Sequence, residues 1–336
     1  MRIAVDAMGG DLAPEAPVRG TIAAVEQHPE VSVTLVGPER RLRELLGTWS
    51  DHPRIAIRAA DEVITMTEAP VAAVRRKPRS SMVQTILSVK EGESVAAISA
   101  GNTGALMAAG LLWIGRIEGV ERPALTAILP SMAQWGVLVL DVGANMDPKP
   151  IHLYQYAVMG SLYCQEALEI ADPRVGLLNV GEEAGKGPPD IREVYRRLSD
   201  SRLRFVGNVE ARELLQGKAD VVVCEGFVGN VVLKLTEGLA RDFLSEFRRI
   251  AGQNLWTRLA GSVLRPGMRR MRERLDYQGY GGAPLLGLDG IVYKCHGSSE
   301  ARTFTAAILV AYNYAKKEAH QRIRERLAQA REGLVQ

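Results

Sequence analysis

The sequence lacks most features that assign a protein to a class at once. Its three cysteines, Cys164, Cys224 and Cys295, are far apart and form no CxxC pair, which argues against a disulfide framework or a zinc site. It contains no GxGxxG and no GxxxxGK[ST] motif, so neither a dinucleotide nor a nucleoside triphosphate is specifically indicated. No apolar run reaches the roughly 18 residues of a membrane span.

An excess of charge of one sign is also missing. The formal net charge is +3 over 336 residues, which is too small to indicate a nucleic-acid partner. Asp6 interrupts the first apolar run, so we expect no signal peptide and a cytoplasmic protein. The 46% of hydrophobic and 24% of charged residues are ordinary for a globular protein.

What the sequence does contain is an alternation of short apolar runs with longer amphipathic segments. This pattern predicts a doubly wound α/β fold with a mostly parallel sheet, in a single catalytic domain over residues 1–336. Few residues join 124–130 to 136–143, so we expect one antiparallel hairpin. Strands are predicted at 2–7, 31–37, 54–60, 95–100, 124–130, 136–143, 174–181, 202–208, 219–226 and 290–296. Helices are predicted at 14–27, 38–47, 80–91, 102–115, 150–171, 210–216, 230–251 and from about 300 to 331.

Polar, glycine-rich turns follow many of the predicted strands. In doubly wound sheets ligands bind outside the carboxyl ends of the strands, so we expect these turns to converge on one crevice. The alternative is that βα turns need glycine for the fold alone. The turns are DAMGGD (6–11), SAGNTG (99–104), DVGANMDPKP (141–150), NVGEEAGKG (179–187), EGFVGN (225–230) and CHGSS (295–299).

The turn SAGNTG opens a predicted helix. Gly101 and Gly104 free the backbone there, and the unpaired N–H groups of a helix start favour an anion such as phosphate. Asn102 and Thr103 offer side-chain hydrogen bonds to the same anion, or simply cap the helix.

Acidic side chains in the other turns also have two possible roles, one structural and one in substrate binding. They can order the loops by hydrogen bonding or contribute to a substrate site, and no spacing makes a Mg²⁺ site specific. Gly9 and Gly10 lie between two of them, and Asn145 follows another. The aspartates are Asp6, Asp11, Asp141 and Asp147.

Three further turn residues are candidates for catalysis. Lys186 in its glycine turn suits a phosphate or a developing oxyanion, unless the loop is only a solvated surface. Asn230 can donate to a carbonyl oxygen or cap the next helix. His296, next to two serines, can act as a general base or be a neutral histidine bonded to backbone.

The segment 254–276 combines an apolar face with an excess of arginine. Pro266-Gly267 is expected to break it into an amphipathic helix pair. Such a pair is typical of a membrane surface, of a dimer interface or of a contact with an acidic protein. The residues expected to make these contacts are Trp256, Leu259, Val263, Arg265, Arg269 and Arg270.

Taken together, the six turns and the stretch FVGNVEARELLQGKADVVVCEGFVGNVVLKLTEG resemble the bacterial acyl-ACP:phosphate acyltransferases of phospholipid synthesis. The resemblance extends from residue 2 to about 316. It implies a phosphotransacetylase- and isocitrate dehydrogenase-like fold, and the formation of acyl-phosphate from long-chain acyl-ACP and inorganic phosphate. We expect no cofactor and assign no residue to a metal, while a metal requirement stays open. Rival interpretations are a phosphotransacetylase that uses acyl-CoA and a non-catalytic scaffold at a membrane surface.

The same resemblance implies partners and residue roles. It implies a homodimer bound peripherally to the inner face of the cell membrane, whose product goes to a membrane glycerol-3-phosphate acyltransferase. Lys186 and Asn230 match positions thought to be catalytic in the family. On this basis the 101–104 turn and Lys186 would hold phosphate, Asn230 would stabilise the oxyanion, and Asp6 and His296 would orient the site.

Overall fold

The computed structural model describes residues 1–132, 136–275 and 281–332. It divides into two compact units: residues 1–126, 158–172 and 278–336 form the first, and residues 127–157 and 173–277 the second. Strand β5 (Ala124–Leu129) and helix α6 (Pro150–Glu166) contribute residues to both. A single catalytic domain over residues 1–336 stays a prediction, because a catalytic domain can include more than one compact unit.

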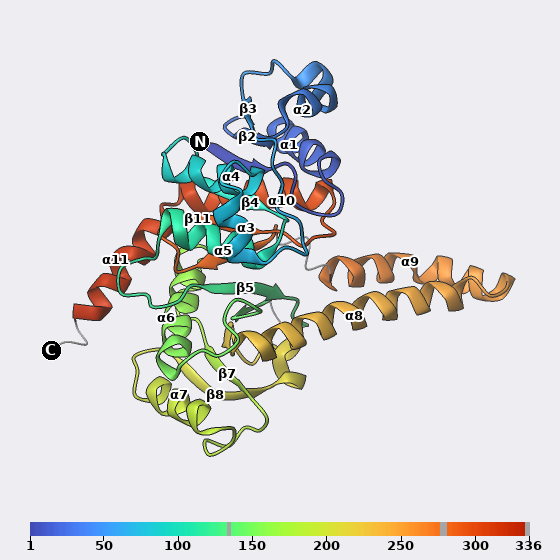
Figure 1. Cartoon of the computed structure of the whole chain (residues 1–336). Coiled ribbons are helices and arrows are strands. Elements are labelled where there is room, and N and C mark those ends of the chain that lie inside the picture. Colours follow the sequence, from blue (N-terminus) through green and yellow to red (C-terminus); the bar gives the residue numbers. More distant parts are fainter. Residues whose placement is uncertain (133–135, 276–280, 333–336) are drawn as a thin grey trace. The chain divides into compact units, whose positions relative to one another are not determined.

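The first unit is built on strands in the order β3-β2-β1-β4-β11-β10-β5 (Figure 1). Its other strands are β1 (Arg2–Asp6), β2 (Ser32–Gly37), β3 (Ile55–Ala59), β4 (Ala96–Ser99), β10 (Ala283–Leu286) and β11 (Ile291–Lys294). Its helices are α1 (Glu15–Gln27), α2 (Glu39–Leu46), η1 (Gly47–Trp49), α3 (Pro70–Arg76), α4 (Ser81–Lys90), α5 (Thr103–Ala109), η2 (Gly110–Ile114), α10 (Ala301–Lys316) and α11 (Ala319–Glu332).

The centre of this sheet is apolar on both faces. Helices α4 and α10 both pack against β1 and β4, and Ile3, Ala4 and Val5 of β1 are completely buried. Strands β1, β2, β3, β4 and β11 pair in parallel, so the carboxyl ends of β1, β4 and β11 lie next to one another. The predicted doubly wound arrangement is confirmed here.

An antiparallel element interrupts the parallel order at a strand that was not predicted, and the hairpin expected between 124–130 and 136–143 stays a prediction. Strand β10 pairs antiparallel with both β11 and β5. Its sequence, APLL, is short and contains Pro284, and proline demotes a run as a strand candidate.

The second unit carries the parallel strand order β6-β9-β7-β8. These strands are β6 (Val137–Leu140), β7 (Val175–Asn179), β8 (Phe205–Glu210) and β9 (Val221–Val223). The helices are α7 (Pro189–Ser199), η3 (Ala211–Gln216), α8 (Gly226–Ala251) and α9 (Leu255–Leu275). Strand β8 begins three residues later than predicted and extends to Glu210.

Two predictions about helices were wrong. Helix α9 is continuous through Pro266, so the helix pair consists of α8 and α9, which pack alongside each other (Figure 1). Proline removes one helical hydrogen bond, and the many Arg, Leu and Met residues of α9 favour the helix on both sides of it. The helix predicted from about 300 to 331 is two helices, because Glu318 adopts a φ of 53° between α10 and α11.

Candidate active site

The turns after β1, β4 and β11 meet in the first unit, and we call residues 6–11, 99–104 and 295–299, together with Lys294 at the end of β11, the first turn cluster. A Cβ atom added to Gly9 would lie 2.7 Å from the Gly101 nitrogen. Gly10 has a φ of 103° and lies against the carbonyl of Gly297, which accepts a 2.7 Å hydrogen bond from the Asp11 nitrogen. The predicted convergence is confirmed for these three of the six turns.

Asp6 is the buried anchor of this cluster. Its carboxylate accepts a 2.6 Å hydrogen bond from the Ser99 hydroxyl and a 3.1 Å hydrogen bond from the Met8 nitrogen. Ser99 Oγ in turn accepts from the Gly101 nitrogen at 3.0 Å. Burial raises the pKa of Asp6, opposed by these hydrogen bonds and by the charge of Lys294. Asp6 therefore holds the SAGN turn through Ser99, and its part in a substrate site stays a prediction.

The side chain of Asn102 is fully engaged in holding the structure. Its Oδ1 accepts from the Ala105 nitrogen at 3.1 Å and caps α5. Its Nδ2 donates to the carbonyls of Thr65, Met66 and Glu68 at 3.2–3.3 Å. Of the two roles considered for the Asn102 side chain, the structure supports the cap and not the phosphate ligand.

Thr103 and Gly104 begin α5 with unpaired N–H groups. In the described part of the chain, no hydrogen bond uses these two backbone N–H groups or the Thr103 hydroxyl. Gly104 is also required by packing, because a Cβ there would lie 2.7 Å from Pro70 Cγ. Donors to an anion at this turn are therefore backbone groups and Thr103.

His296 lies in the third turn of the cluster. Its Nδ1 accepts a hydrogen bond from the Ser298 nitrogen at 3.2 Å and lies 2.8 Å from the Ser298 hydroxyl. This pattern fits the tautomer with its proton on Nε2. The neighbouring Ser299 is 1% exposed, and its hydroxyl has no hydrogen-bond partner within the residues described.

Lys294 belongs to this cluster although we did not predict it. It ends β11, opposite Ser99 in β4, and only 8% of its surface is exposed. Its Nζ donates to the Ala100 carbonyl at 3.2 Å and to the Cys295 carbonyl. The sequence signal was a lysine inside the otherwise apolar run GIVYKC, which we assigned to a strand.

In the second unit, Asp141 orders its own turn. Its carboxylate accepts hydrogen bonds of 2.7–3.1 Å from the nitrogens of Gly143, Ala144 and Asn145 and from the Asn145 amide. Burial raises the pKa of Asp141, against these hydrogen bonds. Asp141 and Asn145 therefore have the loop-ordering role, and the substrate-binding role predicted for their side chains finds no free group here.

The same turn packs against the start of α8. A Cβ at Gly229 would lie 2.0 Å from the Asp141 carbonyl oxygen, and one at Gly226 would lie 2.4 Å from the Asn145 carbonyl oxygen. Only glycine allows this approach. The motif EGFVGN thus fixes α8 on the DVGAN turn, and we call residues 141–145 and 225–230 the second turn cluster.

Asn230 is left free by this packing. Helix α8 begins at Gly226, so Asn230 lies in its second turn and is not its cap. A Cβ at Gly143 would lie 3.5 Å from Asn230 Cγ, so the half-buried amide stands directly over this glycine. Across the described ranges, no hydrogen bond engages the Asn230 amide, which is thus able to donate to a substrate oxygen.

The loop that carries Lys186 is held by two asparagines. The Asn179 amide donates to the Lys186 carbonyl at 3.1 Å, and the Asn208 amide donates to the Glu183 carbonyl at 2.8 Å. The Lys186 ammonium itself is half exposed, with Glu183 at 3.8 Å. A weak, exposed ion pair of this kind leaves the ammonium available to an anionic substrate.

The remaining candidate groups are the cysteines and possible clusters of metal-binding side chains. Cys224 is buried, and burial raises the pKa of its thiol, so it is a core residue as expected. No group of three or more His, Cys, Asp or Glu side chains within residues 1–132, 136–275 and 281–332 could hold a metal ion.

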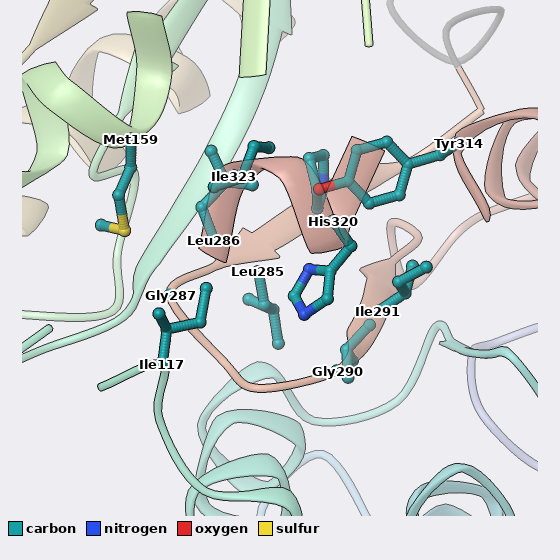
Figure 2. Close-up of a pocket in the computed structure, with 12 residues that line it drawn as sticks. Ile117, Met159, Leu285, Leu286, Gly287, Gly290, Ile291, Tyr314, His320 and Ile323 are labelled. Carbon is teal, nitrogen blue, oxygen red and sulfur yellow. The ribbon is translucent and has the colours of Figure 1, made fainter. Parts of the chain in front are cut away.

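The first unit also contains a small apolar cavity with room for about one water molecule. Figure 2 shows the His320 ring beside Leu285 and Ile291 in its lining, and no residue of the first turn cluster lines it. Burial lowers the pKa of His320 to about 4, while Asp289 opposes and Arg324 supports this shift. Its Nε2 has no hydrogen-bond partner among the described residues.

Helix α9 exposes several of its predicted contact residues. Trp256 is 81% and Val263 75% exposed, and Arg265 and Arg269 are exposed as well. The side chains of Leu259 and Arg270 lie outside the described part of the structure. None of the described helices has both the length and the hydrophobicity to cross a bilayer.

Known proteins match this chain over almost its whole length. A family model described as "Fatty acid synthesis protein" matches residues 1–322. A phosphate acyltransferase of Bacillus cereus (strain G9842) is 50% identical over 318 residues, covering 95% of this chain and 96% of the relative. A phosphate acyltransferase of Bacillus cytotoxicus is 49% identical with the same coverage. The chain belongs to the bacterial phosphate acyltransferase family.

Solved structures support the fold. A phosphotransacetylase from Streptococcus pyogenes superposes with a TM-score of 0.63 at 18% identity, covering 96% of this chain and 94% of that one. A branched-chain phosphotransacylase from Enterococcus faecalis V583 gives 0.57 at 14% identity, covering 93% and 98%. The predicted fold class is confirmed, and the protein is an acyltransferase of phosphate in fatty acid and lipid synthesis.

Proposed function

We propose that this enzyme transfers the acyl group of a long-chain acyl-ACP to inorganic phosphate. A phosphate oxygen attacks the thioester carbonyl carbon, the carbon–sulfur bond breaks, and the carrier leaves as its thiol. The products are acyl-phosphate and free carrier protein. The observation that carries the proposal is the unpartnered Asn230 amide beside Gly143, an uncommitted donor of the kind a developing oxyanion needs.

The nucleophile needs little activation in this reaction. Phosphate is already partly a dianion at neutral pH, so catalysis depends mainly on holding it in place and on compensating its charge. In this proposal, backbone N–H groups at Thr103 and Gly104 bind phosphate, and the Lys186 ammonium compensates charge. Asp6 and His296 keep their turns in position through the hydrogen bonds described above.

A thiol-release assay tests the reaction and its donor. Purified protein is incubated with palmitoyl-ACP or acetyl-CoA, each with and without phosphate, and free thiol is measured. We expect phosphate-dependent release from palmitoyl-ACP only. Release from acetyl-CoA alone would instead support a phosphotransacetylase, and no release from either donor would support a non-catalytic scaffold.

We further propose that α8 forms the contact between two copies of the chain. Helix α8 exposes large apolar side chains at every fourth position along most of its length, and each is at least 46% exposed. A contiguous exposed apolar stripe of this length marks an interaction surface. These residues are Phe227, Val231, Leu235, Leu239, Phe243 and Ile250.

Sedimentation of two variants tests this contact. The double change Leu235→Glu and Leu239→Glu should convert a dimer to a monomer, because it places charges inside the interface. Ser245→Glu, at an exposed polar position of the same helix, should leave the dimer intact. A dimer that persists in the double variant contradicts this part of the proposal.

Helix α9 is proposed to hold the enzyme at the inner face of the cell membrane, near a membrane glycerol-3-phosphate acyltransferase that takes its product. Exposed Trp256 and Val263 supply an apolar surface, and Arg265 and Arg269 supply positive charge for anionic lipid. Flotation with anionic vesicles should be lost in the double variant Trp256→Glu and Val263→Glu. Unchanged flotation would leave the acidic carrier protein as the partner of this surface.

A further inference from the structure

Lys294 is the one buried ammonium that the structure places in the first turn cluster. It is only 8% exposed, and its Nζ donates to the carbonyls of Ala100 and Cys295. Ala100 belongs to the turn after β4, and Cys295 to the turn after β11. The side chain therefore ties two of the three turns of the cluster together.

A continuous set of hydrogen bonds links this lysine to Asp6. The Ala100 carbonyl faces Lys294, while the nitrogen of the same peptide group, at Gly101, donates to Ser99 Oγ. Ser99 then donates to the Asp6 carboxylate at 2.6 Å. The orientation of the 100–101 peptide is thus fixed from one side by a cation and from the other by the hydroxyl bound to Asp6.

The positive charge of Lys294 lies next to the turn after β4, because its Nζ contacts the Ala100 carbonyl. Two of its partners are neutral carbonyls, and the Asp6 carboxylate in its surroundings is itself buried and accepts hydrogen bonds from Ser99 and Met8. A positive charge inside a protein acts over several ångströms with little screening. The turn after β11 also contains the buried hydroxyl of Ser299, which has no hydrogen-bond partner in the described structure.

We propose that Lys294 is a positioning residue for inorganic phosphate. It holds the Ser99–Asn102 turn in its binding conformation and supplies a fixed positive charge beneath it. The thioester donor does not depend on it. This inference rests on the proposed function, because it assigns the phosphate of that reaction to this turn.

Steady-state kinetics of the full chain test the inference with two variants at the same position. Lys294→Gln keeps a hydrogen-bond donor without the charge, and Lys294→Arg keeps the charge. We expect Lys294→Gln to raise the KM for phosphate about 10-fold or more, with the KM for palmitoyl-ACP unchanged. Lys294→Arg should restore most of the phosphate affinity. A purely structural role would instead change both KM values and kcat together.

Arg54 provides a matched control. Its guanidinium also joins two backbone carbonyls, those of His28 and Val31, at the amino end of β3. Arg54→Gln should lower the melting temperature and leave the phosphate KM unchanged. If Lys294→Gln does not fold, hydrogen exchange of the wild-type protein decides, because phosphate should slow exchange at residues 99–104.

The possible outcomes separate this inference from the proposed function. A wild-type chain without phosphate-dependent turnover overturns both. An active wild type with an unchanged phosphate KM in Lys294→Gln overturns the role of Lys294 alone. Unchanged exchange at residues 99–104 of an active wild type with saturating phosphate overturns the placement of phosphate at this turn, and the role of Lys294 with it.

Discussion

The two turn clusters use the same kinds of residue in different ways. In the first, side chains hold the turns: Asp6, Lys294 and Asn102 are all committed to backbone or hydroxyl partners. The groups left over are backbone N–H groups at the start of α5. In the second, Asp141 and Asn145 hold their turn, and the Asn230 amide remains free.

This difference shows how burial separates structural from chemical roles. A carboxylate such as Asp141, with no exposed surface, has its hydrogen-bonding capacity taken up by its own turn. Asn230 and Lys186 are partly exposed and carry weak partners or none. The first cluster is therefore suited to binding an anion with its backbone, and the second unit to acting on a carbonyl with its side chains.

The largest expected effect comes from the free side chains of the second unit. Lys186→Ala and Asn230→Ala should each lower kcat by about 10²–10³, because in the proposed mechanism each removes a donor that acts on developing charge. The melting temperature should not change, because neither group carries a structural hydrogen bond from its side chain. Lys234→Ala, an exposed lysine of α8, is the control and should keep normal turnover. Near-normal activity of Lys186→Ala would remove its assignment.

A smaller effect should distinguish the two buried aspartates. Asp141→Asn places an NH₂ group among four N–H donors and should cost about 3 kcal/mol of unfolding free energy. Asp6→Asn should cost about 1 kcal/mol, because Asn keeps an acceptor for the Met8 nitrogen and the Ser99 hydroxyl can rotate. Urea denaturation measures both, and equal costs would contradict the difference drawn between the clusters.

Asn102 tests the first cluster with a pair of substitutions. Asn102→Ala should lower stability by about 1–2 kcal/mol, because it removes a cap and three loop contacts. Asn102→Asp keeps the cap oxygen and loses only the donors, so it should be less destabilising. The phosphate KM of Asn102→Asp, measured at saturating palmitoyl-ACP, should stay within about threefold of wild type. A much larger rise would return the Asn102 amide to the list of phosphate ligands.

The smallest effect near neutral pH concerns His320, a buried titratable group outside both clusters. Its pKa is about 4 in the folded chain and near 6.5 when unfolded, so the folded state favours the neutral ring. The neutral ring makes its full contribution to the free energy of unfolding above pH 6.5. This contribution is lost as the pH falls toward 4, with about 1 kcal/mol lost by pH 6. Thermal melts from pH 7.5 to 5 should show less pH dependence in His320→Gln. Parallel curves for both proteins would contradict the assigned pKa.

The sequence was informative where the pattern is local. Apolar runs such as 2–7 and 31–37 predict strands because buried strands need continuous apolar residues, and glycines mark the turns that follow. Residues 6–11, 99–104 and 295–299 could be grouped because neighbouring parallel strands end at the same edge of a sheet.

The remaining features depend on contacts that a single sequence does not show. Whether Asn102 or Asp141 turns toward its own backbone or toward a ligand depends on the fold around each turn. Lys294 was missed because a lysine inside a short apolar run gives no sign that its ammonium is buried against two carbonyls. Strand β10 and the continuous α9 were missed because each contains a proline. In a sequence pattern, proline argues against a strand and predicts a break in a helix.

The most direct test of the account follows the phosphate itself. Wild-type protein is incubated with ³²P-labelled inorganic phosphate and palmitoyl-ACP, and label in an organic-soluble, hydroxylamine-sensitive product is compared with thiol release. We predict equal amounts of both, because each phosphate that attacks displaces one carrier. Thiol release without incorporation of label would mean that water is the nucleophile, and would contradict the central claim.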